Sequence, residues 1–212
     1  MAALMTRLLP TVLSLLLLAG ATLRADNLPS LPARVRPLST GSVAPAPSLV
    51  AADGTAFDLR RALAEKPTIL IFYCGGWCPY CNRHLAALAE AELPLRALGL
   101  QIIGITPDAP AQLGPTAAEN HVRYRLLSDR AMRASGAYGV AFRLSPAMGR
   151  GYTENGIDLP PAPDGDGFWQ PVPAAFIVSR DGIIRFVYSN DDPLHPIDMD
   201  DLLVAAKAAA VQ

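Results

Sequence analysis

The sequence predicts an α/β protein in which helices flank a central mixed sheet, and three observations favour this class. A near-continuous apolar run, 68–73, has the composition of a strand buried on both faces. A segment with helical periodicity, 79–98, and a second β-forming run, 100–106, follow it, and this order implies a right-handed parallel crossover. Two further β-forming runs flank Asp181-Gly182, which is typical of an antiparallel hairpin.

Shorter sequence patterns predict the positions of the other helices and strands. Residues 49–57 hold a small hairpin signal around Asp53-Gly54, and Asp58 is placed to cap a short helix. The further elements are expected as helices at 58–64, 108–121, 130–138 and 198–211, with strands at 125–127, 174–179 and 183–189. Ser128 is the expected cap of the third of these helices.

The first 25 residues differ in character from the rest of the chain. A short basic segment precedes an apolar run that ends in small residues, which is typical of a secretory signal peptide cleaved after Ala21 or Ala25. An uncleaved membrane anchor is the alternative. Residues 26–42, rich in proline and small residues, predict an extended linker, and 43–212 the folded domain. We expect the domain to be exported, in a periplasmic or other extracytoplasmic location, with membrane contact only if the leader is uncleaved.

Composition limits the classes of partner. The 212 residues suffice for one domain with a proper core. The formal net charge is −1, and acidic and basic residues are scattered without a basic stripe. Nucleic acid is therefore not an expected partner.

The chemistry of the chain is concentrated where the predicted helix 79–98 begins, at Cys78, Pro79, Tyr80 and Cys81. Unpaired backbone N–H groups and the helix dipole favour an anionic sulfur at this position. A cysteine there has a lowered pKa, and the thiolate attacks disulfides and peroxides. Proline suits the first helical turn, where its missing N–H is not needed. The motif predicts thiol redox chemistry.

Other interpretations of the three cysteines remain open. A purely structural disulfide would close no long loop, because Cys74, Cys78 and Cys81 lie within eight residues. Their C-x3-C-x2-C spacing resembles the iron–sulfur loop of radical S-adenosylmethionine enzymes, although the chain is short for such a barrel. Zinc would need a fourth ligand such as His84. We expect no cofactor and no metal.

The segment 143–171 breaks the regular pattern, being rich in Gly, Pro, Asp and Asn, and predicts an irregular insertion that is functional or loosely ordered. From their apolar character, Phe168 and Trp169 are expected to fold over the mouth of Cys78. Three acidic residues lack the spacing of a calcium loop and predict a hydrated loop instead: Asp158, Asp164 and Asp166.

The order of elements resembles the thioredoxin fold, and more specifically the AhpC/TSA superfamily in its peroxiredoxin-like branch. The resemblance spans about 43–206 and is carried by FYCGGWCPYCN, GLQIIGITPD, LLSDRAMRASGAYGV and PVPAAFIVSRDGIIRFVY. It implies a thioredoxin-like fold with an N-terminal extension and an insertion before the last hairpin.

The resemblance also implies roles for single residues. Cys78 would be the nucleophilic thiol and Cys81 the resolving one. Pro173 matches the cis-proline of the family and would bring the backbone of Val172 beside the disulfide, to pair with an extended substrate chain. A trans Pro173 that starts an edge strand is the alternative.

Two neighbours of the motif are also assigned. Trp77, directly before the nucleophile, is expected to shield one side of the disulfide. Cys74 is expected either to be a buried small hydrophobe or to form an alternative bridge with one of the other two cysteines.

The sequence departs from the family at the groups that hold peroxide. True peroxiredoxins place threonine or serine three residues before the peroxidatic cysteine, proline seven before it, and arginine beside the last hairpin. Counted from Cys78, these positions hold Gly75, Ile71 and Pro173. The strand 69–73 also lacks the buried acid of thioredoxin, so the proton acceptor for Cys81 is unidentified.

These departures lead us to expect an exported thiol–disulfide oxidoreductase that acts on protein or small-molecule disulfides. The alternative is a thiol-dependent peroxidase that uses the same two cysteines and a thiol reductant. A redox-sensitive binding module is a third reading of the same residues.

Overall fold

The computed structural model describes residues 35–162, 165, 167–192 and 195–210. The expected signal peptide, most of the expected linker, and both Asp164 and Asp166 lie outside the described residues. None of the helices among the described residues combines the length and the apolar composition needed to cross a bilayer.

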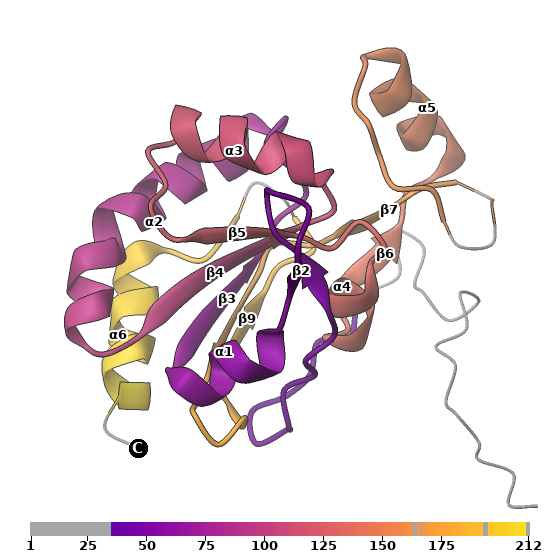
Figure 1. The fold of residues 1–212 in the computed structure, drawn as a ribbon. Helices are drawn as coiled ribbons and strands as arrows, with labels where there is room; N and C mark the ends of the chain where they lie inside the picture. The colour runs from indigo at the N-terminus through magenta and orange to yellow at the C-terminus, as the bar shows by residue number, and fades with distance from the viewer. Residues whose placement is uncertain (1–34, 163–164, 166, 193–194, 211–212) are drawn as a thin grey trace, which may run out of the picture.

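A seven-stranded mixed sheet forms the centre, with strand order β2-β1-β5-β4-β3-β8-β9 (Figure 1). β3, β4 and β5 run parallel, while β8 and β9 are antiparallel to their neighbours, which confirms the crossover and the hairpin expected from the sequence. The strands are β1 (Leu49–Val50), β2 (Ala56–Phe57), β3 (Thr68–Phe72), β4 (Gln101–Thr106), β5 (Arg125–Ser128), β8 (Ala174–Val178) and β9 (Ile184–Ser189).

Helices cover both faces of this sheet. One face carries α1 (Leu59–Glu65) and α4 (Arg133–Ala137). The other carries α2 (Pro79–Ala97), α3 (Pro110–Glu119) and α6 (Met199–Ala210). The architecture is therefore the α/β class that the sequence predicts.

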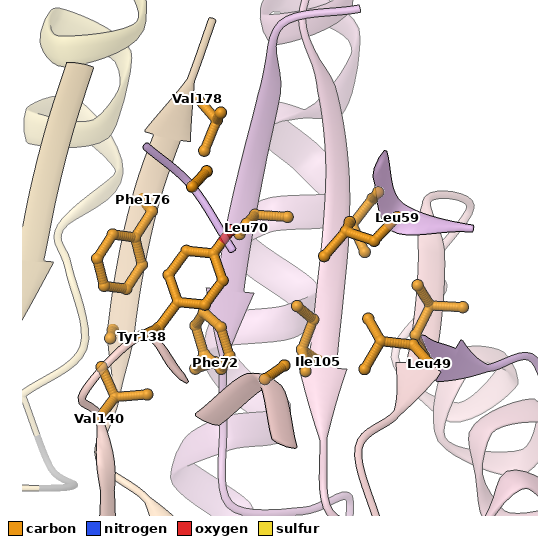
Figure 2. Close-up of a cluster of buried hydrophobic side chains, with 14 of the residues drawn as sticks. Leu49, Leu59, Leu70, Phe72, Ile105, Tyr138, Val140, Phe176 and Val178 are labelled. Atoms are coloured by element: carbon orange, nitrogen blue, oxygen red, sulfur yellow. The ribbon is translucent and has the colours of Figure 1, made fainter. Parts of the chain in front are cut away.

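The strand that leads to the cysteines is buried along its whole length. Because successive side chains of a strand point to opposite faces, Leu70 and Phe72 enter one core and Ile69 and Ile71 the other. Figure 2 shows the first of these cores, where Phe72 packs against Tyr138 with ring centroids 5.1 Å apart. Anchored on both faces, β3 gives the chain segment that follows it a rigid starting point.

The insertion is more regular than the sequence predicts. A second, two-stranded sheet forms from β6 (Ala141–Arg143) and β7 (Trp169–Pro171), and α5 (Pro146–Glu154) lies between them. Ser145 caps α5 by accepting a hydrogen bond from the Met148 N–H at 3.3 Å. In Figure 1 this excursion projects from the main sheet. Strands of three residues are too short to produce a periodic pattern, which explains the wrong expectation.

The helix expected at 130–138 is also shorter than predicted, because its N-cap is Met132, whose φ of 54° lies in the left-handed region. Ser128 is not its cap. The Asp129 carboxylate accepts hydrogen bonds from the backbone N–H groups of Ala134 and Ser135, at 3.0 and 2.7 Å. The Ser128 hydroxyl instead donates to the Asp108 carbonyl oxygen at 2.6 Å. This bond ties β5 to the segment that follows β4.

The described part of the expected linker lies against the domain. The Leu38 N–H donates to the Tyr138 carbonyl at 3.1 Å, and the Gly41 N–H to the Ile184 carbonyl at 2.8 Å.

Candidate active site

The cysteines lie between the end of β3 and the first turn of α2. Cys78 is the N-cap of α2, with Pro79 as the first helical residue. The Cys78 N–H donates to the Gly75 carbonyl at 3.2 Å, which closes a tight turn, and the Asn82 N–H donates back to the Cys78 carbonyl at 3.0 Å. The N-terminal end of α2, where free N–H groups stabilise negative charge, is therefore directed at the Cys78 sulfur.

The three thiols form one buried cluster. Their exposed fractions are 7, 6 and 7% for Cys74, Cys78 and Cys81, and all three are free cysteines. The Sγ atoms of Cys74 and Cys81 are 3.2 Å apart, within contact distance. All three sulfurs lie within 4.8 Å of one another. The third cysteine, Cys74, thus contacts the C-x-x-C pair rather than packing elsewhere in the core.

The pKa values of the three thiols shift in different directions. Hydrogen bonds from the Cys74 and Cys81 thiols, followed by those from the Cys81 and Tyr80 N–H groups, hold the pKa of Cys78 well below its usual range. The contact with Cys74 lowers the pKa of Cys81, but the hydrogen bond to Cys78 and burial outweigh it and raise that pKa. The Cys78 and Cys81 contacts, with burial, raise the pKa of Cys74. These directions favour ionisation at Cys78, with Cys74 and Cys81 kept as thiols.

The turn before Cys78 is held from three sides. The Gly76 N–H donates to the Asp108 carboxylate at 2.7 Å, and the Asn82 side-chain amide donates to the Gly76 carbonyl at 2.8 Å. A Cβ at Gly76 would lie 2.1 Å from the Thr116 hydroxyl oxygen. Burial raises the pKa of Asp108, although the Gly76 N–H opposes this. The sequence interpretation missed Asp108, which follows β4, because it looked for an acid on β3 alone.

Gly75 occupies the position at which the resemblance expects threonine or serine, and the position has no space for a side chain. Its φ is +154°, a conformation that side chains rarely adopt. A Cβ there would lie 2.2 Å from the Trp77 Nε1 and 2.8 Å from an Asp108 carboxylate oxygen. The absence of the family's hydroxyl at this position follows from the shape of the turn.

A mostly apolar cavity of about 290 Å³ opens on the thiol cluster. Cys78 and Cys74 line it, whereas Cys81 does not. The indole of Trp77 forms one wall and lies against Tyr152 of α5, with ring centroids 5.0 Å apart. The remaining lining residues are Pro79, Tyr80, Phe142, Leu144, Met148, Gln170, Pro171, Val172, Pro173 and Asp191.

The insertion contributes to this cavity through residues other than those expected. Phe168 packs against Gly149, and Trp169 is buried with Met132 and its neighbours, so neither lines the cavity. Met148 and Tyr152 of α5 line it instead. Apolar character alone did not identify them because the helix that presents them was not predicted.

Val172 and Pro173 lie beside the cluster, in the cavity wall. The Val172 N–H donates to the Val140 carbonyl at 2.9 Å. The sequence interpretation expects the Val172 backbone to pair with an extended substrate chain, and its N–H group is already used within the protein.

Gln170 is a lining residue that the sequence interpretation did not single out. Its side chain is 4% exposed, and its amide Nε2 has no hydrogen-bond partner among the described residues. A buried donor without a partner is costly, which favours a role for it toward a bound molecule. The described lining residues include no arginine or lysine, and their side-chain N–H and O–H donors belong to Trp77, Tyr80, Tyr152 and Gln170. Of these four, Gln170 has the donor that is buried without a partner.

The remaining candidates lie apart from the thiols. His84 is half-buried on α2, and burial lowers its pKa to about 4. It does not belong to the group of potential metal ligands, which among the described residues consists of the three cysteines. Asp158 pairs with Arg130 at 2.6 Å.

Comparisons with known proteins agree with this architecture. Residues 40–187 match the sequence profile of the AhpC/TSA family. A Haemophilus influenzae protein described as a Bcp-type peroxiredoxin is 30% identical over 118 residues, which cover 56% of this chain and 75% of that protein. Peroxiredoxin Bcp of Escherichia coli is 26% identical over 156 residues, 74% of this chain and 88% of its own.

Solved structures show the same fold. The peroxidoxin BcpB of Mycobacterium tuberculosis superposes with a TM-score of 0.63 at 20% identity, covering 81% of this chain and 97% of its own. Reduced Prx3 of Vibrio vulnificus, in complex with hydrogen peroxide, gives 0.64 at 16% identity, covering 80% and 99%. The two sequence relatives, both described as peroxiredoxins, fit the peroxidase alternative better than the disulfide-exchange interpretation. The chain belongs to the AhpC/TSA family and is an oxidoreductase that acts on peroxides or thiols.

Proposed function

We propose that this protein is a thiol-dependent peroxidase in which Cys78 reacts with the peroxide and Cys81 resolves the product. The observation that carries the proposal is the position of Cys78. It is the N-cap of α2 and lines the cavity, whereas Cys81 lies close to it but outside the cavity lining. The lowered pKa of Cys78 agrees with this assignment.

The reaction balances with these two residues and an external dithiol. The Cys78 thiolate attacks the terminal oxygen of a hydroperoxide, forming the S–O bond as the O–O bond breaks. The alkoxide takes a proton and leaves as the alcohol. The Cys81 thiol then attacks the sulfenic sulfur, which forms the disulfide and releases water. The dithiol reduces that disulfide through a mixed disulfide.

The cavity favours organic hydroperoxides over hydrogen peroxide. Its lining is mainly aromatic and aliphatic, and burial of a hydrocarbon group there contributes about 25 cal/mol per Å². Hydrogen peroxide has no group that could use this surface. We therefore expect a higher kcat/KM for cumene hydroperoxide than for hydrogen peroxide.

Gln170 supplies the donor that the missing arginine would provide. Gln170 lines the cavity that contains Cys78, and its Nε2 is buried without a partner, so a small rotation of the side chain would bring this donor to a peroxide oxygen. Gln170→Leu should lower kcat/KM by roughly tenfold to a hundredfold, as loss of a preorganised donor does. The alkylation rate of Cys78 should not change, and a variant with wild-type kcat/KM would remove Gln170 from the mechanism.

The deciding experiment is stopped-flow oxidation of the reduced protein by cumene hydroperoxide, hydrogen peroxide and a small disulfide, with Cys78→Ser as the blank. Faster reaction with peroxides supports the peroxidase, and faster reaction with the disulfide contradicts it. Trapping the sulfenic acid with dimedone in Cys81→Ser should label Cys78. In Cys78→Ser it should give no label, because the proposal assigns the sulfenic acid to Cys78. Label on Cys81 there would reverse the two roles.

We further propose that the protein works outside the cytoplasmic membrane, on the basis of the leader-like composition of residues 1–25. Amino-terminal sequencing of the protein from fractionated cells tests this. A mature terminus after Ala21 or Ala25 in the extracytoplasmic fraction is expected, and an intact terminus in the cytoplasmic fraction would contradict it.

A further inference from the structure

The thiol cluster has the geometry of a three-coordinate metal site. Cys74 comes from the turn after β3, and Cys78 and Cys81 come from the start of α2, so two separate elements fix the three sulfurs. Metal–thiolate bonds of about 2.3 Å place three sulfurs roughly 4 Å apart around a trigonal ion. The Sγ atoms here lie within 4.8 Å of one another, which meets this requirement with small side-chain adjustments.

The number of ligands selects among metals. Structural zinc takes four protein ligands. An iron–sulfur cluster held by three cysteines, which the C-x3-C-x2-C spacing resembles, would bind each sulfur to a different iron atom, and three sulfurs within 4.8 Å of one another suit a single ion better. Among the described residues, no histidine or carboxylate joins the three sulfurs to make a fourth ligand. Thiolates are soft donors that favour Cu(I), and a closed-shell monovalent ion accepts three of them.

The surroundings suit a soft ion as well. The cavity that exposes Cys74 and Cys78 gives an ion a route to the sulfurs, and the thioether of Met148 lines the same cavity. The N-terminal end of α2 stabilises the negative charge of the coordinated thiolates. We propose that Cys74, Cys78 and Cys81 form a binding site for one Cu(I) ion per chain.

This site does not depend on the proposed peroxidase reaction, although both use the same sulfurs. A bound ion occupies the Cys78 thiolate, so the loaded protein should not react with peroxide until a chelator removes the metal. Metal binding also requires all three sulfurs to be reduced, because a Cys78–Cys81 disulfide leaves only Cys74 to bind the ion.

The test uses the full, reduced chain without oxygen, titrated with Cu(I) supplied as its acetonitrile complex against a competing Cu(I) chelator. We expect one ion per chain and a sulfur-only shell in X-ray absorption. Cys74→Ser should weaken binding by more than about tenfold, because only two thiolates remain. His195→Gln, which alters an exposed histidine outside the cluster, should bind Cu(I) as the wild type does.

Equal affinity of the wild type and Cys74→Ser would overturn the proposal, and so would nitrogen or oxygen in the metal shell of the wild type. Far-ultraviolet circular dichroism of the Cys74→Ser protein shows whether it is folded, and Cys74→Ala provides a second variant without any donor. None of these readouts uses peroxide, so the result stands apart from the outcome for the peroxidase.

Discussion

At the scale of single residues, Cys74 has the clearest testable consequence. Its thiol makes the largest contribution to the lowered pKa of Cys78. Cys74→Ala should therefore raise the pKa of Cys78, and the pH at which iodoacetamide alkylates Cys78 at half its maximal rate should rise. Cys74→Ser is the matched control because a hydroxyl can still donate. Equal midpoints for the wild type and the alanine variant would contradict this account.

Asp108 links a single carboxyl group to the pH dependence of stability. Burial raises its pKa above the ordinary value of 3.8, so ionisation costs the native state stability as pH rises through the folded-state pKa. Asp108→Asn keeps an oxygen to accept from the Gly76 N–H and cannot ionise. Relative to the wild type, this variant should become more stable as the pH rises from about 4 to the folded-state pKa of Asp108, and the gain should then level off. Urea unfolding of the reduced proteins measures the difference, and a constant difference would oppose the prediction.

At the scale of elements, the turn between β3 and α2 depends on close packing against α3. Gly76→Ala puts a methyl group 2.1 Å from the Thr116 hydroxyl oxygen, and we expect a loss of about 1–3 kcal/mol in unfolding free energy. Gly114→Ala, on the same helix α3, meets nothing within 4 Å and should be neutral or stabilising. The double variant Gly76→Ala/Thr116→Ala should recover part of the loss. No recovery would mean that the backbone, rather than Thr116, resists the methyl group.

At the scale of the whole molecule, the segment between β6 and β7 both completes the main core and forms part of the cavity wall. Leu144 and Leu159 are buried in the core that packs against β3, whereas Met148 and Tyr152 line the cavity. In the double variant Met148→Ser/Tyr152→Ser, the core residues and the thiol cluster should remain in place, while two large side chains leave the cavity wall. We expect this variant to react similarly with cumene hydroperoxide and hydrogen peroxide. If the variant still preferred the organic substrate, that preference would have to come from other residues of the cavity wall.

The elements of the main sheet could be predicted because their patterns are long. The buried strand β3, the helix that starts at Pro79 and the hairpin at Asp181-Gly182 each carry a local signal of five residues or more. The short strands β6 and β7 carry none. Cys78 and Cys81 were candidate residues from their spacing. Asp108 follows β4 and Gln170 lies on β7, far from the cysteines in the sequence. Only the three-dimensional pairing of those strands with β3 and β6 brings them to the site.

The turn at Gly75 also constrains which amino-acid substitutions this site can accept during evolution. Introducing threonine there would collide with the Trp77 indole and with Asp108 in a single step. Losing the indole first would remove the cavity wall that Tyr152 packs against. Each order of events passes through a destabilised intermediate, so we expect a hydroxyl-bearing residue at position 75 to occur together with a change at Trp77. Gly75 and Trp77 are therefore expected to be inherited as a pair, and their joint presence should mark a distinct lineage of these enzymes.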